Sequence, residues 1–164
     1  MTPLPPGPRP EARVAGPGDQ GRLVELWTEA ERELVVMRGG RVLLGLNGRS
    51  APVALSFASQ LGDPAQRLVV GVLATQVVGY GSCRTRTLAG SDLLGSIEDL
   101  YVVPEARRQG VGGAIAGALL EWCHAEGCTG VDANALPGSR AVKSFFESKA
   151  FAARLLIMYR PLGD

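Results

Sequence analysis

The chain has 164 residues, a length that fits one domain with a core of its own. Hydrophobic residues make up 46% and charged residues 20%, and the formal net charge of +1 gives no basis for expecting nucleic-acid binding or adsorption to a membrane. No apolar run approaches the ~18 residues that a membrane span needs, and the N-terminus carries no basic-then-apolar leader. Three cysteines without CxxC spacing predict reduced thiols in a cytoplasmic protein.

The first half of the chain is predicted to start with a disordered tail over residues 1–11, because five prolines and no apolar periodicity occupy its first ten residues. No linker or repeat follows, so residues 12–164 are predicted to form a single domain. The elements predicted in this half are a strand over 12–15, an amphipathic helix over 20–37, a segment over 41–46 that fits either a short helix or a strand, and a helix over 53–61.

The second half is predicted to be rich in strands. Residues 66–75 and 76–87 form an antiparallel hairpin, and a β-rich run over 97–103 ends at Pro104. The elements predicted after it are a helix over 114–126, a strand over 130–136, a helix over 141–149 and a final strand over 152–160, which could pair across a homodimer. This order predicts an α+β fold with a mixed, largely antiparallel sheet flanked by helices and one central strand–loop–helix–strand crossover.

A basic, glycine-rich turn over residues 107–113 joins the strand at 97–103 to the helix. It contains two arginines and three glycines in seven residues. Strand, glycine turn and helix N-terminus in this order form an anion-binding device, because free N–H groups and the helix dipole both favour negative charge. The predicted ligand is a phosphate or pyrophosphate. The structural alternative is an ordinary glycine-rich entry to a helix.

Two familiar phosphate motifs fail here. The dinucleotide fingerprint GxGxxG needs a small third residue, but Ile115 follows Gly110 and Gly112 at that position. A P-loop forced onto residues 112–117 would be followed by Ala118 and Leu119, so it has neither the lysine for the phosphates nor the hydroxyl for magnesium. The motif that remains is Arg-x-x-Gly-x-Gly after a strand.

That motif and its surroundings resemble the GNAT superfamily of acyl-CoA-dependent N-acetyltransferases. The resemblance rests on the strand Glu-Asp-Leu-Tyr-Val-Val-Pro-Glu at 98–105, the Arg107-x-x-Gly110-x-Gly112 loop, and the closing segment 138–151 with its paired phenylalanines. It implies a GNAT-like fold and direct transfer of an acetyl group from acetyl-CoA to a primary amine, of a small molecule or a protein, within a ternary complex.

The resemblance also implies the cofactor-binding residues. Backbone N–H groups of residues 108–113 are expected to hold the CoA pyrophosphate, and the strand at 100–102 to offer backbone groups to the pantetheine arm and the thioester. The residues implied in cofactor binding are Leu100, Tyr101, Val102, Arg107, Arg108, Gln109, Gly110, Val111, Gly112, Gly113, Ser139 and Phe146.

Glu98 is the candidate general base. An amine arrives protonated and must lose a proton before it attacks the thioester, and a carboxylate can accept that proton directly or through a water. Strand alternation predicts Glu98 on the same face as Leu100 and Val102, with Asp99 on the other. The alternative is a carboxylate that orients the substrate, or a solvated residue of the sheet.

The closing segment departs from the family pattern. Phe146 stands where many members carry a tyrosine thought to protonate the leaving thiolate, Ser139 replaces an asparagine, and Ala150 replaces a glycine, which matters if the backbone there needs a positive φ. Either no general acid is used or another donor serves, with Tyr159 or Tyr101 as candidates.

Two further readings stay open. The chain could bind acyl-CoA as a regulatory module without turnover, or bind a nucleotide unrelated to CoA. No metal site is expected, because a single histidine has no cysteine or carboxylate cluster around it. The acceptor amine is not identified by any motif.

Overall fold

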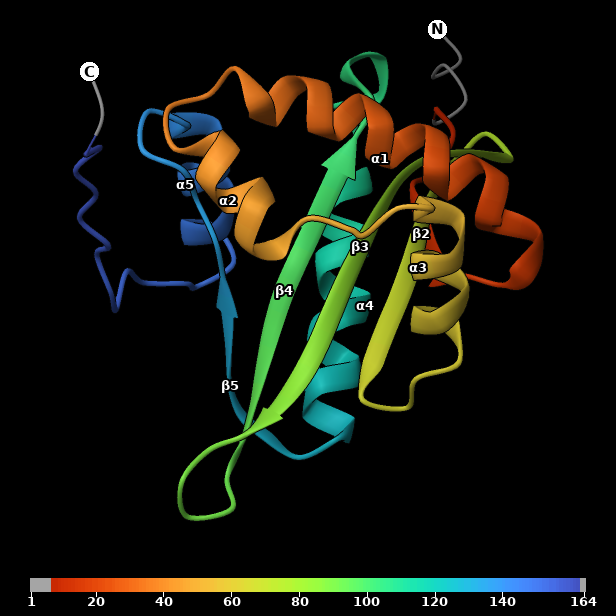
Figure 1. Ribbon diagram of the computed structural model, residues 1–164. Helices are drawn as coiled ribbons and strands as arrows, with labels where there is room; N and C mark the ends of the chain where they lie inside the picture. Colours follow the sequence, from red (N-terminus) through yellow and green to blue (C-terminus); the bar gives the residue numbers. More distant parts are fainter. Residues whose placement is uncertain (1–6, 163–164) are drawn as a thin grey trace, which may run out of the picture.

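The computed structural model describes residues 7–162 and shows one five-stranded sheet with helices on both faces (Figure 1). The strands follow one another across the sheet in chain order. All neighbours are antiparallel except the last two, which are parallel. The strands are β1 (Glu11–Val14), β2 (Gln66–Leu73), β3 (Gln76–Thr87), β4 (Leu93–Val102) and β5 (Cys128–Ala133).

Three helices lie between β1 and β2, and a fourth connects the parallel pair. The helices are α1 (Gln20–Val35), α2 (Gly40–Asn47), α3 (Val53–Leu61), α4 (Val111–Ala125) and α5 (Arg140–Glu147). Parallel neighbours need such a crossover, because the chain must return to the same end of the sheet. The predicted α+β class, with a mixed and largely antiparallel sheet, is confirmed. Within residues 7–162 no helix is both long and apolar enough to cross a membrane.

The sheet separates two hydrophobic cores. Helices α1 and α3 cover one face, and α4 covers the other (Figure 1). Glycines allow the close approach of α4: a Cβ at Gly71 or Gly81 would lie 2.7 Å or 2.6 Å from Ile115 atoms. Side chains buried on the α4 face include Val69, Val102, Ile115, Leu119 and Phe146. Those buried on the other face include Leu23, Leu26, Phe57, Val70 and Tyr80.

Several predicted elements are confirmed, and others are corrected. The helix over 53–61 and the strand over 76–87 have the predicted bounds, the ambiguous segment is helical as α2, and β4 begins earlier than predicted, at Leu93. Of the predicted disordered tail, residues 1–6 lie outside the described residues, residues 7–10 form no helix or strand, and Glu11 already belongs to β1.

The predicted final strand over 152–160 is wrong. Residues 151–162 form neither helix nor strand, and Leu155, Ile157 and Met158 are largely exposed. Arg154 pairs with Asp132 of β5, so a side-chain contact and not a backbone ladder connects this segment to the sheet. Residues that favour strands are not enough to form one here, because a strand is stabilised by pairing with neighbouring strands.

Candidate active site

The two parallel strands separate halfway along β4. Their pairing ends where Ile97 lies beside Ala133, while β4 continues to Val102, so its outer edge beyond Ile97 has no strand partner among the described residues. The N–H of Val103 donates to the Val78 carbonyl at 2.9 Å. Because orientations alternate along an antiparallel strand, the backbone groups of Leu100 and Val102 then point away from β3.

This unpaired edge is the one expected to meet the pantetheine arm. Leu100 and Val102 present their backbone groups there, as the resemblance implies. Tyr101 does not, because it lies opposite Tyr80 with its backbone groups turned towards β3. Leu100 therefore has both backbone groups available to a ligand and Val102 has its N–H, because the Val102 carbonyl accepts from Arg107 Nε. Tyr101 contributes to the sheet.

The loop before α4 forms an uncapped helix N-terminus beside this edge. Gly110 is the N-cap in a left-handed conformation with φ 86°, and no side chain caps the helix. The N–H of Ala114 donates to the Gly110 carbonyl at 2.9 Å. The preceding N–H groups of Val111, Gly112 and Gly113 have no acceptor within the helix, which is the condition for binding an anion.

Lys149 adds a positive charge at this helix start. Its Nζ lies 3.3 Å from the position that a Cβ of Gly113 would occupy. The residue lies just after α5, in a turn that continues with Ala150 at φ 63°. No sequence pattern connects Lys149 to the loop, because only the packing of α5 beside α4 brings them together. A lysine here reinforces the attraction of the helix N-terminus for a phosphate.

Arg107 does not point towards the start of α4 as Lys149 does, but towards β4 and α1. Its Nε donates to the Val102 carbonyl at 2.8 Å, and its Nη2 donates to both carboxylate oxygens of Glu33 at 2.7 and 2.8 Å. Arg107 thus fastens the loop to β4 and α1. The Tyr101 hydroxyl donates to the same Glu33 at 3.0 Å, and burial together with this carboxylate raises the pKa of Tyr101 to about 12.

The remaining loop side chains are exposed at the surface. Arg108 has a left-handed backbone with φ 61°, and the Gln109 side chain donates to the Glu105 carbonyl at 2.9 Å. Neither side chain is needed to form the row of free N–H groups. The predicted binding of an anion by this loop would therefore depend mainly on its backbone.

A β-bulge in β4 places two carboxylates on one face. Ser82 pairs with Asp99 and Cys83 pairs with Ile97, so Glu98 has no partner on β3. Glu98 and Asp99 both line a pocket of about 460 Å³ between β3, β4 and the α2–α3 segment. The prediction that Glu98 shares a face with Leu100 and Val102 is wrong, because the extra residue of the bulge interrupts the alternation.

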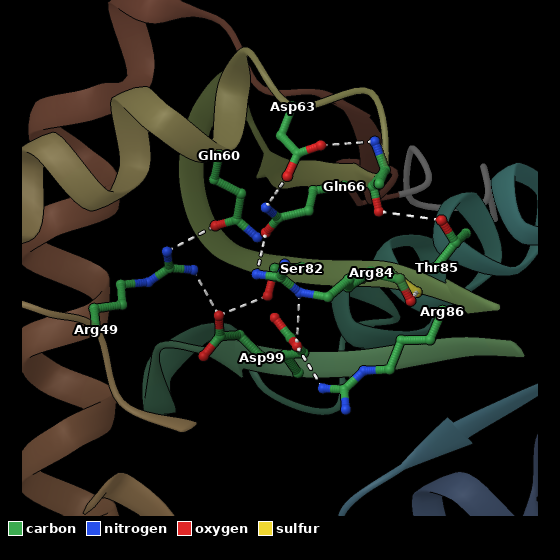
Figure 2. A network of polar contacts seen from close by, with 12 residues as sticks. Arg49, Gln60, Asp63, Gln66, Ser82, Arg84, Thr85, Arg86 and Asp99 are labelled. Atoms are coloured by element: carbon green, nitrogen blue, oxygen red, sulfur yellow. Dashed lines mark hydrogen bonds and ion pairs between the residues drawn. The ribbon is translucent and has the colours of Figure 1, made fainter. Parts of the chain in front are cut away.

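Asp99 anchors a buried polar network. Its Oδ2 accepts hydrogen bonds from Arg49 Nη2 at 2.7 Å and from Ser82 Oγ at 2.6 Å. Figure 2 shows Arg49 extending to Asp99 and to Gln60, whose Oε1 accepts from Arg49 Nη1 at 2.7 Å. The Arg49 guanidinium also lies 3.7 Å from the Phe57 ring centroid. Asp99 therefore holds the α2–α3 segment against the sheet.

Glu98 is held more loosely. Its Oε1 accepts from Arg84 Nε at 3.2 Å and from Arg86 Nη2 at 3.4 Å. Both arginines are well exposed, at 41% and 59% of the side chain. Among the described residues Glu98 Oε2 has no hydrogen-bond partner, so this oxygen is available to a ligand or a water.

The residues predicted in the closing segment do not line the pocket that contains Glu98. Phe146 is buried on the α4 face, edge-on to the rings of Phe145 and Phe151 at centroid distances of 5.3 and 5.1 Å. Ser139 precedes α5 without a side-chain cap. Tyr159 belongs to the segment that forms no strand, and it is 67% exposed. The structure does not bring Tyr159 into a common group with Glu98.

Residues 7–162 contain no group of three or more histidine, cysteine or carboxylate side chains able to hold a metal ion.

The acetyltransferase (GNAT) family model matches residues 23–151, which is most of the chain. The chain belongs to the acetyltransferase (GNAT) family. One curated relative of the chain is the aminoglycoside N(6')-acetyltransferase type 1 of Klebsiella aerogenes, which is 32% identical over 80 residues, or 47% of the chain. The chain spans about half of that relative's length, 53%.

Solved structures share the fold of this chain at lower identity. An acetyltransferase of Trypanosoma brucei is 23% identical with a TM-score of 0.66, and the match covers 93% of this chain and 99% of that one. The aminoglycoside N-acetyltransferase AAC(6')-Iy, solved in complex with CoA, is 16% identical with a TM-score of 0.73, covering 98% and 99%. At such identities the likeness establishes the fold and not the substrate.

Proposed function

We propose that this protein transfers the acetyl group of acetyl-CoA directly to a primary amine within a ternary complex. The observation that carries the proposal is the separation of β4 from β5 beside the uncapped start of α4, with Glu98 at the bulge on the same strand. Membership of the acetyltransferase family supports the acetyl donor. The aminoglycoside acetyltransferases among its relatives support an amine as acceptor.

The cofactor would lie along the unpaired edge of β4. The free N–H groups at residues 111–113, with Lys149 beside them, suit the pyrophosphate. The backbone groups of Leu100 suit an amide of the pantetheine arm, which would pair as an added strand does. The N–H of Val102 then polarises the thioester carbonyl, while Arg107 holds the carbonyl of the same residue.

Glu98 would supply the base. The incoming ammonium group loses a proton to the carboxylate, directly or through one water, and the nitrogen lone pair attacks the thioester carbon. The C–N bond forms, the C–S bond breaks and CoA leaves as a thiolate, while the extra proton on the acylated nitrogen passes to that thiolate or to solvent, which leaves a neutral amide. A thiol with a pKa of about 8.5 is a fair leaving group without prior protonation. A tyrosine hydroxyl at position 146 is therefore dispensable in this scheme. Of the two tyrosines considered as the proton donor to the thiolate, Tyr101 already donates its hydroxyl to Glu33, which leaves Tyr159 as the candidate.

The test is CoA release at saturating acetyl-CoA across a panel of primary amines. We expect amine-dependent release in the wild type and its loss in Glu98→Gln. The second candidate, an acyl-CoA-binding module without turnover, is motivated by the buried Phe146. Calorimetry would separate the two: CoA binding with no amine-dependent release in either protein would favour the module. Thermal stabilisation by ATP but not by CoA would refute both.

A further inference from the structure

The charges that line the 460 Å³ pocket cancel one another. Two carboxylates, Glu98 and Asp99, face two guanidinium groups, Arg49 and Arg84. Each carboxylate is already paired, Asp99 with Arg49 at 2.7 Å and Glu98 with Arg84 at 3.2 Å. The other polar side chains of the lining are serines and amides, so the pocket offers no surplus of negative charge.

Such a lining suits a polycation poorly. Binding several ammonium groups at once needs carboxylates that are free of partners, and here each new cation would compete with an arginine already in place. The pocket instead holds an unused donor on Arg84, which is 41% exposed. Arg84 uses Nε for Glu98 and Nη2 for Gln66, so within the described residues Nη1 is unpaired.

Arg84 lines the same pocket as Glu98, whose Oε2 is unpaired among the described residues. A ligand with one ammonium and one carboxylate group would match both ends: its carboxylate accepts from Arg84, and its amine approaches Glu98. The volume is within the range of small-molecule sites.

We infer that the acceptor of this acetyltransferase is a small zwitterion, an amine that also carries a carboxylate, such as a free amino acid, and that Arg84 selects for the carboxylate. This inference rests on the proposed function, because it concerns the acceptor of that reaction. It differs from the aminoglycosides named for the relatives, which carry several amines and no carboxylate.

The experiment compares kcat/KM for matched acceptors at saturating acetyl-CoA. Each free amino acid is paired with its own carboxamide, and an aminoglycoside is included. We expect the acids to exceed the amides by about tenfold or more, as one charge-assisted contact allows. In Arg84→Met that preference should fall to near unity through a higher KM for the acid, and Arg84→Lys should restore part of it.

Arg86→Met is the matched control. Arg86 also pairs with Glu98, but it does not line the pocket, so its removal should leave the preference for acids intact. An effect on kcat/KM that both variants share would come from the lost ion pair with Glu98 and not from a contact with the substrate carboxylate. Amides or aminoglycosides used as well as the acids would overturn the inference while leaving the transferase function standing. An unchanged preference in Arg84→Met would overturn the role of Arg84, and no CoA release with any amine would refute the function itself.

Discussion

Glu98→Gln and Asp99→Asn should separate chemistry from structure at two adjacent carboxylates. The partners of Glu98 are exposed arginines, and exposed ion pairs contribute about 0–1 kcal/mol each. Glu98→Gln should therefore change the free energy of unfolding by no more than about 1–2 kcal/mol, the sum of the two pairs. If Glu98 is the base, the same variant should lower kcat by about 10²–10⁴-fold.

Asp99 should show the opposite balance. Its partner Arg49 is only 8% exposed, and hydrogen bonds to charged groups contribute about 1.5–3 kcal/mol. Asp99→Asn keeps an acceptor oxygen but loses the charge, so we expect a loss of about 2 kcal/mol and a fall in Tm of about 4–8 °C. The fraction of Asp99→Asn that remains folded should retain more activity than Glu98→Gln.

The assay combines urea unfolding with initial rates of CoA release for both variants. Rates must be taken well below each variant's own Tm, so that unfolding does not imitate a catalytic loss. Full activity in Glu98→Gln would refute its role as base. Wild-type stability in Asp99→Asn would refute the view that the Asp99–Arg49 pair anchors the α2–α3 segment.

Three further results are expected. Lys149→Met should weaken CoA binding by about fivefold at low salt and reduce its salt dependence in calorimetry, whereas Lys143→Met, in the exposed pair on α5, should not. Ala150→Gly should stabilise the protein by about 0.5–1 kcal/mol in urea unfolding, because glycine removes the steric strain of an alanine with a left-handed backbone. A loss of stability would contradict this. Hydrogen bonds from Arg13 lower the pKa of Asp19, so its stabilisation is complete above about pH 4 and is lost as the pH falls through the folded pKa. Asp19→Asn should therefore lose less stability than wild type between pH 5 and pH 3, and equal losses would count against this role.

Much of the fold could be predicted because its signals are local. Pro52 and Gly62 flank α3, and the hairpin turn between β2 and β3 interrupts two β-rich runs, so these bounds were predictable. The predicted strand over 152–160 fails because no strand of the described chain pairs with it. The alternation rule fails at Glu98 because a bulge arises from how β3 pairs with β4, which the sequence of β4 alone does not reveal.

The sequence by itself located the glycine-rich turn for which anion binding is predicted, and it identified Ala150 as a replacement for a glycine that matters if φ is positive; φ there is 63°. Both depend on a few consecutive residues, whose glycine pattern and helix start are readable without tertiary contacts. Only the tertiary structure decided the rest of the site. It brought Lys149 to the start of α4, turned Arg107 to Glu33, and placed Arg49 against Asp99, because these contacts join segments that are distant in the chain.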